Sequence, residues 1–415
     1  MKKIIRSLLD LDFYKLTMAQ LAWKRHADVP VRYGFTNRTK GVALAETVRE
    51  EDLRREIDHA RGLRFSEEEL AYLYESPFIP KGTFGEPFLG FLAGLSLPEV
   101  EIERAGDGYR IETEAPWPQA MFWETMLLGI VNELHYRSLL ERDGVTRGTE
   151  REDEFWRDGC ARLKAKIARL KDAAPDAKFI EFGTRRRFEA AWQGALVQIL
   201  MDDLPDQLLG TSNVHLAKTL GIRPVGTFAH EMYMVYAGID GATDEGLLAS
   251  HNRVLRDWWE EYGEPLSIAL TDTYGTGFFF RDMTGEQAAA WRGLRQDSGD
   301  PEAFGERAIA FYQRHGVDPA TKSVVFSDGL DVEAIVRLQA RFRGRIGTVY
   351  GWGTNLTNDL GYAPLSLVVK AIRSCGRPTV KLSDNPAKAT GPADEVDRYK
   401  RVFGYEEGTR VECTY

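Results

Sequence analysis

Short apolar runs alternate with longer amphipathic segments through the middle of the chain, from residue 178 to residue 356. Each apolar run has the length of a buried strand and ends in small or polar residues, and a helical pattern of apolar positions follows it. The helical segments are clearest at 240–262, 301–315 and 331–343. Because strands alternate with helices, we expect a parallel sheet, and seven such units predict a closed or nearly closed α/β barrel.

Polar residues follow each of the seven predicted strands. In a barrel, the C-terminal ends of the strands face one shared site, so we expect these residues to converge although they lie far apart in the sequence. The segments are EFGTRR at 181–186, GTSN at 210–213, GTFAHE at 226–231, TDTYG at 271–275, RQDSGD at 295–300, SDG at 327–329 and GWGTN at 351–355.

The first 118 residues have a mixed pattern that predicts a small α+β domain. A strand is expected at 31–36, and Ser66 and Glu69 have the spacing of a capping box at the start of a helix. Alternating apolar and polar residues on both sides of 106–108, a Gly-Asp-Gly turn, predict a β-hairpin. Further helices are expected at 8–24, 44–61, 121–140 and 150–170.

The pattern changes again near the C-terminus. Two apolar runs, at 366–371 and 378–382, predict strands that leave the barrel and pack on the N-terminal domain, and a polar loop begins at residue 381. We therefore expect residues 1–118 and 366–415 to form one α+β domain and residues 119–365 to form the α/β barrel.

The charge and the cysteine pattern narrow the classes of function. The 415 residues carry a net charge of −9, which argues against a nucleic-acid partner and requires a local basic pocket if the substrate is a small anion. The three cysteines are far apart and lack C-x-x-C spacing, which argues against disulfides and a zinc site and fits the cytoplasm. The longest apolar stretch, 88–97, is too short to span a bilayer, so no membrane partner is expected.

Several familiar catalytic motifs are absent. The sequence has no P-loop, no G-x-S-x-G nucleophile motif and no dinucleotide-binding glycine motif. His230 is not followed by a second histidine four residues later, which excludes the zinc-protease helix.

The residues that follow the predicted strands suit a phosphorylated sugar instead. Gly-Thr and Asp-Gly turns offer backbone N–H groups to phosphates, and the helices that follow add favourable N-termini. Each arginine alone could equally form a surface ion pair, and each carboxylate could cap a turn, but their recurrence at seven strand ends favours a binding site. The candidate phosphate or carboxylate ligands are Arg185, Arg186 and Arg295. The candidate ligands of ribose hydroxyls, or of Mg²⁺ carried by a diphosphate, are Asp272, Asp297 and Asp328.

These segments, in this order, resemble those of nicotinate phosphoribosyltransferases, and DFYKLTM at 12–18 fits the N-terminal motif of that family. The resemblance covers nearly the whole chain. It implies the type II phosphoribosyltransferase fold, an irregular α/β barrel with a second α+β domain built from the N-terminal region and the C-terminal tail.

The resemblance also implies a reaction. Nicotinate attacks C1 of 5-phosphoribosyl 1-diphosphate, which gives nicotinate mononucleotide and diphosphate in NAD salvage. ATP is a coupled substrate, Mg²⁺ accompanies the diphosphate and ATP, and no protein ligand of the metal is assigned. The protein is expected to be a cytoplasmic homodimer with shared active sites, in which the neighbouring subunit supplies Tyr14.

The same motif matches assign roles to individual residues. The catalytic residues implied are His230, which is phosphorylated by ATP, Arg295 and Asp297. The nicotinate site implied consists of Tyr14, Phe182, Ser212, Thr227 and Arg295. The phosphoribosyl diphosphate site implied consists of Arg185, Asp272, Asp297, Ser298, Asp328, Gly329, Gly351, Gly353, Thr354 and Asn355.

Two other functions remain open at this point. Nicotinamide phosphoribosyltransferases share the fold but have an acidic residue where Ser212 stands. We favour nicotinate because a carboxylate substrate would be repelled by an acidic residue there. The other alternative is a phosphosugar-binding barrel without catalysis, which the joint presence of His230, Arg295 and Asp297 disfavours.

Overall fold

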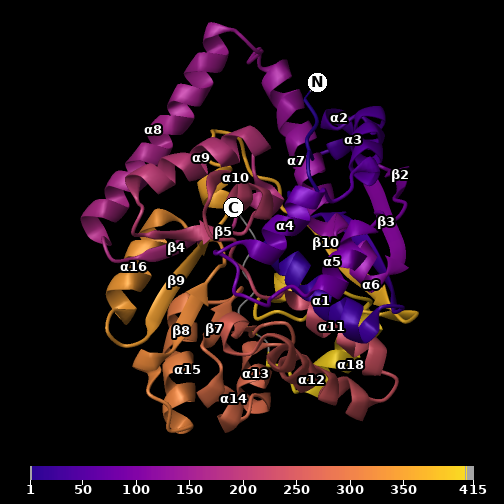
Figure 1. Ribbon diagram of the computed structural model, residues 1–415, viewed down its shortest axis with the longest axis vertical. Coiled ribbons are helices and arrows are strands. Elements are labelled where there is room, and N and C mark those ends of the chain that lie inside the picture. The colour runs from indigo at the N-terminus through magenta and orange to yellow at the C-terminus, as the bar shows by residue number, and fades with distance from the viewer. Residues whose placement is uncertain (1, 407, 409–415) are drawn as a thin grey trace.

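The computed structural model describes residues 2–406 and 408, so the end of the predicted tail, 409–415, lies outside the described residues. Six parallel strands form one sheet, in the order β5-β4-β9-β8-β7-β6, as predicted for a barrel of alternating strands and helices. Figure 1 shows helices around the outside of this sheet. The strands are β4 (Lys178–Glu181), β5 (Leu208–Thr211), β6 (Ile268–Leu270), β7 (Gly293–Gln296), β8 (Ser323–Phe326) and β9 (Gly347–Trp352).

One of the seven predicted strands does not form. The segment around Pro224 lies between β5 and β6, where a seventh strand would close the barrel, but it makes only an isolated parallel bridge with Thr211. Val225 donates its N–H to Thr211 O over 2.8 Å, and Thr227 Oγ1 donates to Ile268 O over 3.1 Å on the other side. Because Pro224 has no N–H for a sheet ladder, the barrel closes irregularly here.

The helices that follow the strands agree with the predicted pattern. The helix expected at 240–262 starts at Asp244, because the preceding helix ends at Asp240. The helices of the barrel surround the sheet, and several of them pack against its strands. They are α8 (Glu150–Ala173), α9 (Ala190–Asp203), α10 (Val214–Leu220), α11 (His230–Asp240), α12 (Asp244–Tyr262), α13 (Thr276–Asp282), α14 (Gly285–Ala290), α15 (Pro301–Arg314), α16 (Val332–Phe342) and α17 (Thr354–Thr357), with 3₁₀ turns at Thr184–Arg186, Glu264–Leu266 and Pro319–Thr321; a further 3₁₀ turn, Pro386–Lys388, lies in the C-terminal tail.

A second, antiparallel sheet combines the two ends of the chain. Its order is β11-β10-β1-β3-β2, and β10 from the tail pairs directly with β1 from the N-terminal region. This confirms the predicted α+β domain, although the second tail strand contains only two residues. The strands are β1 (Pro30–Asn37), β2 (Glu101–Ala105), β3 (Gly108–Pro116), β10 (Leu367–Ser374) and β11 (Arg377–Pro378).

The helices of this domain also follow the sequence signals. Ser66 Oγ accepts a hydrogen bond from Glu69 N, and the Glu69 carboxylate accepts one from Ser66 N, which is the predicted capping box. Within residues 2–406 and 408, no helix is long and apolar enough to cross a membrane. The helices are α1 (Phe13–His26), α2 (Leu44–Thr47), α3 (Glu50–Gly62), α4 (Glu67–Glu75), α5 (Glu86–Ala93), α6 (Trp117–Ala120), α7 (Trp123–Arg142) and α18 (Ala393–Phe403).

Helix α7 connects the two parts. It is buried from Trp123 to Tyr136, and it continues into an end that projects beside α8 (Figure 1). Asn132 Nδ2 donates to Arg185 O over 3.0 Å, so this helix holds the loop that follows β4. The mouth of the barrel therefore faces α1, α7 and the antiparallel sheet.

Candidate active site

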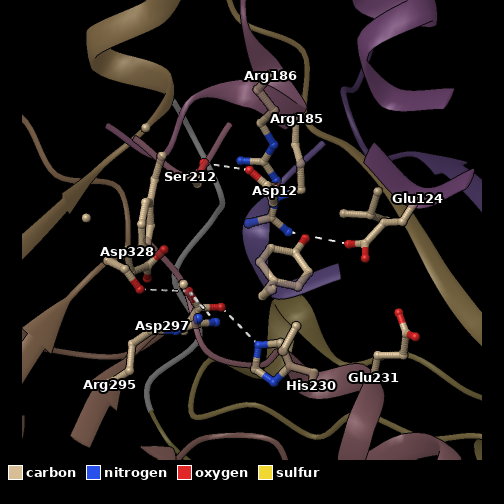
Figure 2. Close-up of a pocket in the computed structure, with 18 of the residues that line it drawn as sticks. Asp12, Glu124, Arg185, Arg186, Ser212, His230, Glu231, Arg295, Asp297 and Asp328 are labelled. Carbon is tan, nitrogen blue, oxygen red and sulfur yellow. Dashed lines mark hydrogen bonds and ion pairs between the residues drawn. The ribbon is translucent and has the colours of Figure 1, made fainter. Parts of the chain in front are cut away.

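A pocket lies between the mouth of the barrel and the antiparallel sheet (Figure 2). Most residues that the sequence assigned to the site line this pocket, although they come from seven segments of the chain. These lining residues are Tyr14, Phe182, Arg185, Arg186, Ser212, His230, Arg295, Asp297, Asp328, Gly329, Gly351, Gly353, Thr354 and Asn355.

Three expected site residues do not line the pocket. The hydroxyl of Thr227 binds the backbone of β6, as described above, so it stabilises the irregular closure of the barrel. Asp272 and Ser298 are buried beside the pocket, where Ser298 Oγ donates to Asp272 Oδ2 over 2.6 Å. Asp272 lies next to His230, which lines the pocket. Asp272 and Ser298 therefore support the pocket wall from behind.

The pocket is basic although the protein is acidic. Its lining, among the described residues, includes seven basic side chains and five carboxylates, so basic groups outnumber acidic ones. This is the local basic pocket that a small anionic substrate requires. The cationic residues are Arg38, Arg185, Arg186, Arg295, Lys370, Lys381 and Lys388, and the acidic ones are Asp12, Glu124, Glu231, Asp297 and Asp328.

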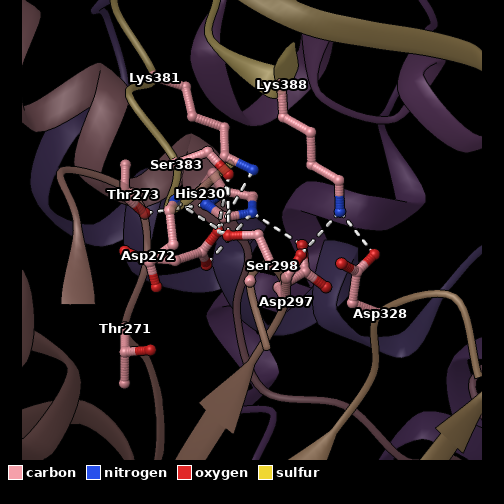
Figure 3. A network of polar contacts seen from close by, with 12 residues as sticks. His230, Thr271, Asp272, Thr273, Asp297, Ser298, Asp328, Lys381, Ser383 and Lys388 are labelled. Atoms are coloured by element: carbon pink, nitrogen blue, oxygen red, sulfur yellow. Dashed lines mark hydrogen bonds and ion pairs between the residues drawn. The ribbon is translucent and has the colours of Figure 1, made fainter. Parts of the chain in front are cut away.

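His230 is the first residue of α11 and is held at both ring nitrogens (Figure 3). Nδ1 lies 2.9 Å from Thr273 Oγ1, and Nε2 lies 2.9 Å from Asp297 Oδ2. Burial, and then the nearby Lys381 ammonium, lowers the pKa of His230 to about 4. The imidazole is therefore neutral near pH 7, with Nε2 on the side of Asp297 and the pocket.

Two carboxylates lie next to this histidine. Burial alone would raise the pKa of Asp297, but the hydrogen bond from His230 and the charge of Arg295 hold it well below its usual value, so Asp297 is ionised. Asp272 Oδ2 lies 3.6 Å from Lys381 Nζ, whereas Asp272 Oδ1 is buried, has no hydrogen-bond partner within residues 2–406 and 408, and lies 3.9 Å from His230 Nε2. Ligand atoms of His230, Asp272 and Asp297 all lie within 4.8 Å of one another.

Arg295 lines the pocket and has one donor that is unsatisfied among the described residues. Its side chain is 11% exposed, and one terminal nitrogen donates to Phe228 O over 3.3 Å. Its Nε is buried and has no partner among the described residues. A buried donor without an acceptor is costly, so an anionic group that reaches Nε would be bound favourably.

Phe182 depends on two glycines of the neighbouring strand end. A Cβ on Gly351 would lie 2.7 Å from Phe182 Cδ2, and a Cβ on Gly353 would lie 3.1 Å from Phe182 O. Phe182 N also donates to Trp352 O over 2.9 Å. The GWG segment thus leaves space for the aromatic ring at the pocket wall.

Tyr14 of the same chain lies in the pocket, so a second subunit is not needed to supply this ring. The start of α1 is held at the barrel because Phe13 N donates to Ser212 O over 2.7 Å. Gly226 permits the close approach, since its Cβ would lie 3.1 Å from Tyr14 N. The Arg185 guanidinium lies 5.9 Å from the centre of the Tyr14 ring.

Sequence reasoning missed two carboxylates of the pocket, Asp12 and Glu124. Ser212 Oγ donates to Asp12 Oδ1 over 2.6 Å, so the serine hydroxyl is already committed to a carboxylate. Arg185 lies between the two acids, with Nε 3.6 Å from Asp12 Oδ2 and a terminal nitrogen 3.5 Å from Glu124 Oε1. Asp12 belongs to the DFYKLTM motif, which was the available signal; Glu124 had none.

Sequence reasoning also missed the basic residues that the antiparallel domain contributes. Lys388 Nζ donates to Asp328 Oδ1 over 2.5 Å and to Asp297 O over 3.1 Å (Figure 3). Burial, and then the charge of Lys381, lowers the pKa of Lys370 to about 7. These lysines follow β9 in the chain, and only the pairing of β10 with β1 brings them to the barrel mouth.

Comparisons with known proteins agree with this geometry. Residues 9–132 match the model of the nicotinate phosphoribosyltransferase N-terminal domain, and residues 177–407 match that of the nicotinate phosphoribosyltransferase family. The chain is similar to the crystal structure of nicotinate phosphoribosyltransferase from Vibrio cholerae, with 33% identity, 97% of this chain and 94% of that chain covered, and a TM-score of 0.86. It is also similar to the enzyme from Porphyromonas gingivalis, with 31% identity, 97% and 100% covered, and a TM-score of 0.84.

Proposed function

This chain belongs to the nicotinate phosphoribosyltransferase family, and we propose that it couples formation of nicotinate mononucleotide to ATP hydrolysis through a phosphohistidine at His230. The substrates are nicotinate, 5-phosphoribosyl 1-diphosphate and ATP. The observation that carries the proposal is the neutral, buried His230, whose Nε2 faces the ionised Asp297 in a basic pocket.

Nicotinate binds beside Arg295 in this proposal. Its carboxylate accepts a hydrogen bond from the unpartnered Nε of Arg295, and its ring lies between Phe182 and Tyr14. Ser212 orients Asp12 rather than the substrate, because its hydroxyl hydrogen is committed. The positive charge of Arg185 offsets the negative charge of Asp12, so the repulsion between Asp12 and a carboxylate substrate is reduced.

Phosphoribosyl diphosphate occupies the rest of the pocket. The lone pair of the pyridine nitrogen forms the bond to C1, the bond from C1 to the diphosphate oxygen breaks, and diphosphate leaves with the electron pair. Positive charge that develops on the ribose is stabilised by Asp297 and Asp328, and negative charge on the diphosphate by Lys370, Lys381 and Lys388. Positioning of the two reactants supplies much of the remaining acceleration.

The residues near His230 also fit Mg²⁺ carried by a diphosphate. Asp272 Oδ1 is a buried carboxylate oxygen that no donor in the described part of the chain reaches, and Asp297 adds a second ionised carboxylate close by. Carboxylate oxygens are the ligands that Mg²⁺ prefers. Asp297 and Asp272 would hold the ion, which when bound neutralises charge on the leaving diphosphate.

ATP phosphorylates His230 at Nε2. The Nε2 lone pair forms the bond to the γ-phosphorus, the bond from that phosphorus to the bridging oxygen breaks, and ADP leaves with the electron pair. The attacking form is the neutral tautomer whose single ring proton is on Nδ1, where Thr273 Oγ1 accepts it, so the proton that Nε2 donates to Asp297 must leave Nε2 before the attack. The hydrogen bond between Nε2 and Asp297 must break in this step. The phosphoryl group then adds negative charge to the site that binds anions.

Labelling with ATP tests this proposal. We expect wild-type protein incubated with [γ-³²P]ATP and Mg²⁺ to carry an acid-labile label, and nicotinate mononucleotide and ADP to appear together when nicotinate and phosphoribosyl diphosphate are added. His230→Ala should abolish the label. His59→Ala is a matched control, because His59 lies on α3 outside the pocket lining, and it should keep the label. Equal labelling of His230→Ala and wild-type protein would refute the phosphohistidine.

We propose a homodimer in which each site takes Tyr14 from its own chain rather than from the neighbouring subunit. The aromatic ring of Tyr14 is present within one chain, so activity should not fall when dilution separates subunits. Activity measured across the concentration range in which light scattering records dissociation tests whether a second subunit contributes.

A further inference from the structure

Glu231 follows His230 directly, and its carboxylate is fully bound by donors from outside the barrel. The side chain is 6% exposed. Oε1 accepts hydrogen bonds from Tyr33 Oη over 2.6 Å and from Trp117 Nε1 over 2.7 Å, and Oε2 pairs with Lys15 Nζ. These donors belong to β1, α6 and α1, which all lie in the N-terminal α+β domain.

Lys15 extends this set of contacts across the pocket. It is completely buried and pairs with Glu124 as well as with Glu231. Burial alone would lower the pKa of Lys15, but the charges of Glu124 and Glu231 raise it, so the ammonium stays charged. Glu124 in turn lies 3.5 Å from Arg185, so buried charges of alternating sign lead from the start of α11 to the partly exposed Arg185 at the pocket wall.

The N-terminus of α11 lacks a polar cap, although Tyr233 Oη on the same turn donates to Leu270 O of β6 over 3.1 Å. Its N-cap residue, Ala229, makes no side-chain hydrogen bond to the helix. The orphan N–H groups of a helix start are usually satisfied by a polar cap, and its direction is often fixed that way. Here the Glu231 carboxylate attaches this turn to three elements of the other domain, and His230 is on the same turn (Figure 2).

We propose that Glu231 and Lys15 are positioning residues for His230. They attach the start of α11 to the N-terminal domain, so that the imidazole keeps Nδ1 at Thr273 and Nε2 at Asp297. This inference rests on the proposed role of His230. It explains why a buried lysine with two carboxylates lies beside the site, although none of the three needs to touch a substrate.

Tyr33→Phe is the mildest change that tests the proposal. It removes the hydroxyl that binds Glu231 Oε1 and keeps the buried ring. We expect it to slow formation of the phosphohistidine about tenfold, because the lost hydrogen bond is to a charged group. The KM for nicotinate should stay within about twofold, because Tyr33 does not line the pocket. Glu231→Gln should slow labelling further, since it also removes the charge that Lys15 opposes.

Tyr236→Phe is the matched control. Tyr236 is also buried and lies on α11 itself, and its hydroxyl donates to Asp257 Oδ2 over 2.8 Å, away from the first turn. We expect a similar loss of Tm for Tyr33→Phe and Tyr236→Phe, but slower labelling only for Tyr33→Phe. If a bound ligand restores the Tm of Tyr33→Phe, the labelling rate of this variant should still stay low.

An NMR measurement separates this proposal from the proposed function. In protein with ¹³C-labelled histidine, at one fixed pH, the His230 imidazole resonance should shift or broaden in Tyr33→Phe and Glu231→Gln and stay unchanged in Tyr236→Phe. If wild-type protein takes no label from ATP, the phosphohistidine is refuted. The His230 resonance in the variants still tests whether Glu231 and Lys15 position the imidazole. An unchanged His230 resonance in both Tyr33→Phe and Glu231→Gln, or an equal change in Tyr236→Phe, would overturn it.

Discussion

Lys388 Nζ lies 2.5 Å from Asp328 Oδ1, so a residue of the C-terminal tail forms an ion pair with a carboxylate at the end of β8. Sixty residues separate the two in sequence. The same ammonium donates to Asp297 O, which fixes the tail loop across the barrel mouth. Burial raises the pKa of Asp328, and the Lys388 charge opposes this effect.

Removing this lysine should weaken phosphoribosyl diphosphate binding. We expect Lys388→Met to raise the KM for phosphoribosyl diphosphate about tenfold or more, because a charge-assisted contact to phosphate is lost and Asp328 is left without its partner. The KM for nicotinate should change little. Steady-state kinetics check this, with Lys218→Met as the control, because Lys218 forms an exposed pair with Glu68 far from the pocket. An unchanged KM would mean that Lys388 serves only to hold Asp328.

Lys370 should make binding of diphosphate depend on pH. Its pKa of about 7 means that the amine loses its proton as the pH rises through neutrality, whereas a bound anion favours the ammonium. Affinity should therefore fall as the pH rises above 7, by roughly tenfold for each unit by which the anion raises the pKa. Calorimetric titration at pH 6.5 and pH 8.5 measures this. Diphosphate itself also titrates in this range, so the same measurement on Lys370→Met gives the part of the pH dependence that does not come from the lysine. An equal pH dependence of affinity in the two proteins would contradict the assignment of Lys370 as a diphosphate ligand.

Gly351→Ala should damage the aromatic wall of the pocket. The added Cβ would lie 2.7 Å from Phe182 Cδ2 and 3.0 Å from Ser327 Cβ, so the ring must move. We expect a loss of about 1–3 kcal/mol in unfolding free energy and a higher KM for nicotinate. Denaturant unfolding and steady-state kinetics test both effects. Gly62→Ala is the control, because nothing lies within 4 Å of its Cβ, and a wild-type KM in Gly351→Ala would show that Phe182 is not a nicotinate contact.

The buried pair of Asp10 and Arg187 should dominate the stability of the N-terminal junction. The guanidinium donates to both carboxylate oxygens, over 2.6 and 2.8 Å. Removing one member of a buried pair leaves an uncompensated charge, so Arg187→Met should cost about 3–5 kcal/mol. Denaturant unfolding measures this, and a loss below about 1 kcal/mol would contradict it.

The same pair predicts a pH dependence of stability. Burial alone would raise the pKa of Asp10, but Arg187 holds it below 3.8 in the folded protein. The stabilisation is therefore fully present above pH 3.8 and is lost as the pH falls through the folded pKa. The free energy of unfolding, measured between pH 5 and pH 3, should change less with pH in Asp10→Asn than in wild-type protein. Equal changes in the two proteins would show that Asp10 is not a source of the pH dependence.

The barrel and most of its site could be predicted because the signals are local. The residues after β4, β7, β8 and β9 follow short apolar runs, and parallel strands place such residues at one edge. The exception was the run at Pro224, where a β-like pattern contains a proline that cannot donate to a ladder. The motif match placed Thr227 at the substrate, whereas its hydroxyl binds β6.

The contribution of the antiparallel domain could not be predicted. Lys370 reaches the pocket because β10 pairs with β1, which lies more than three hundred residues earlier in the chain. Glu124 reaches it on a helix whose apolar pattern indicated only burial. The sequence predicts no acidic group at position 212, because a serine stands there. In the folded chain, however, the carboxylate of Asp12 binds the Ser212 hydroxyl, and the sequence gives no sign of this contact.

The most direct test is a steady-state comparison of pyridines with the wild-type protein, phosphoribosyl diphosphate, Mg²⁺ and ATP. We expect nicotinate mononucleotide and diphosphate to form in equal amounts, with kcat/KM for nicotinate at least about a hundredfold above that for nicotinamide, because in the proposed site a carboxylate, but not an amide, would gain a charge-assisted hydrogen bond from Arg295. Absence of nicotinate mononucleotide, or a preference for nicotinamide, would contradict the account.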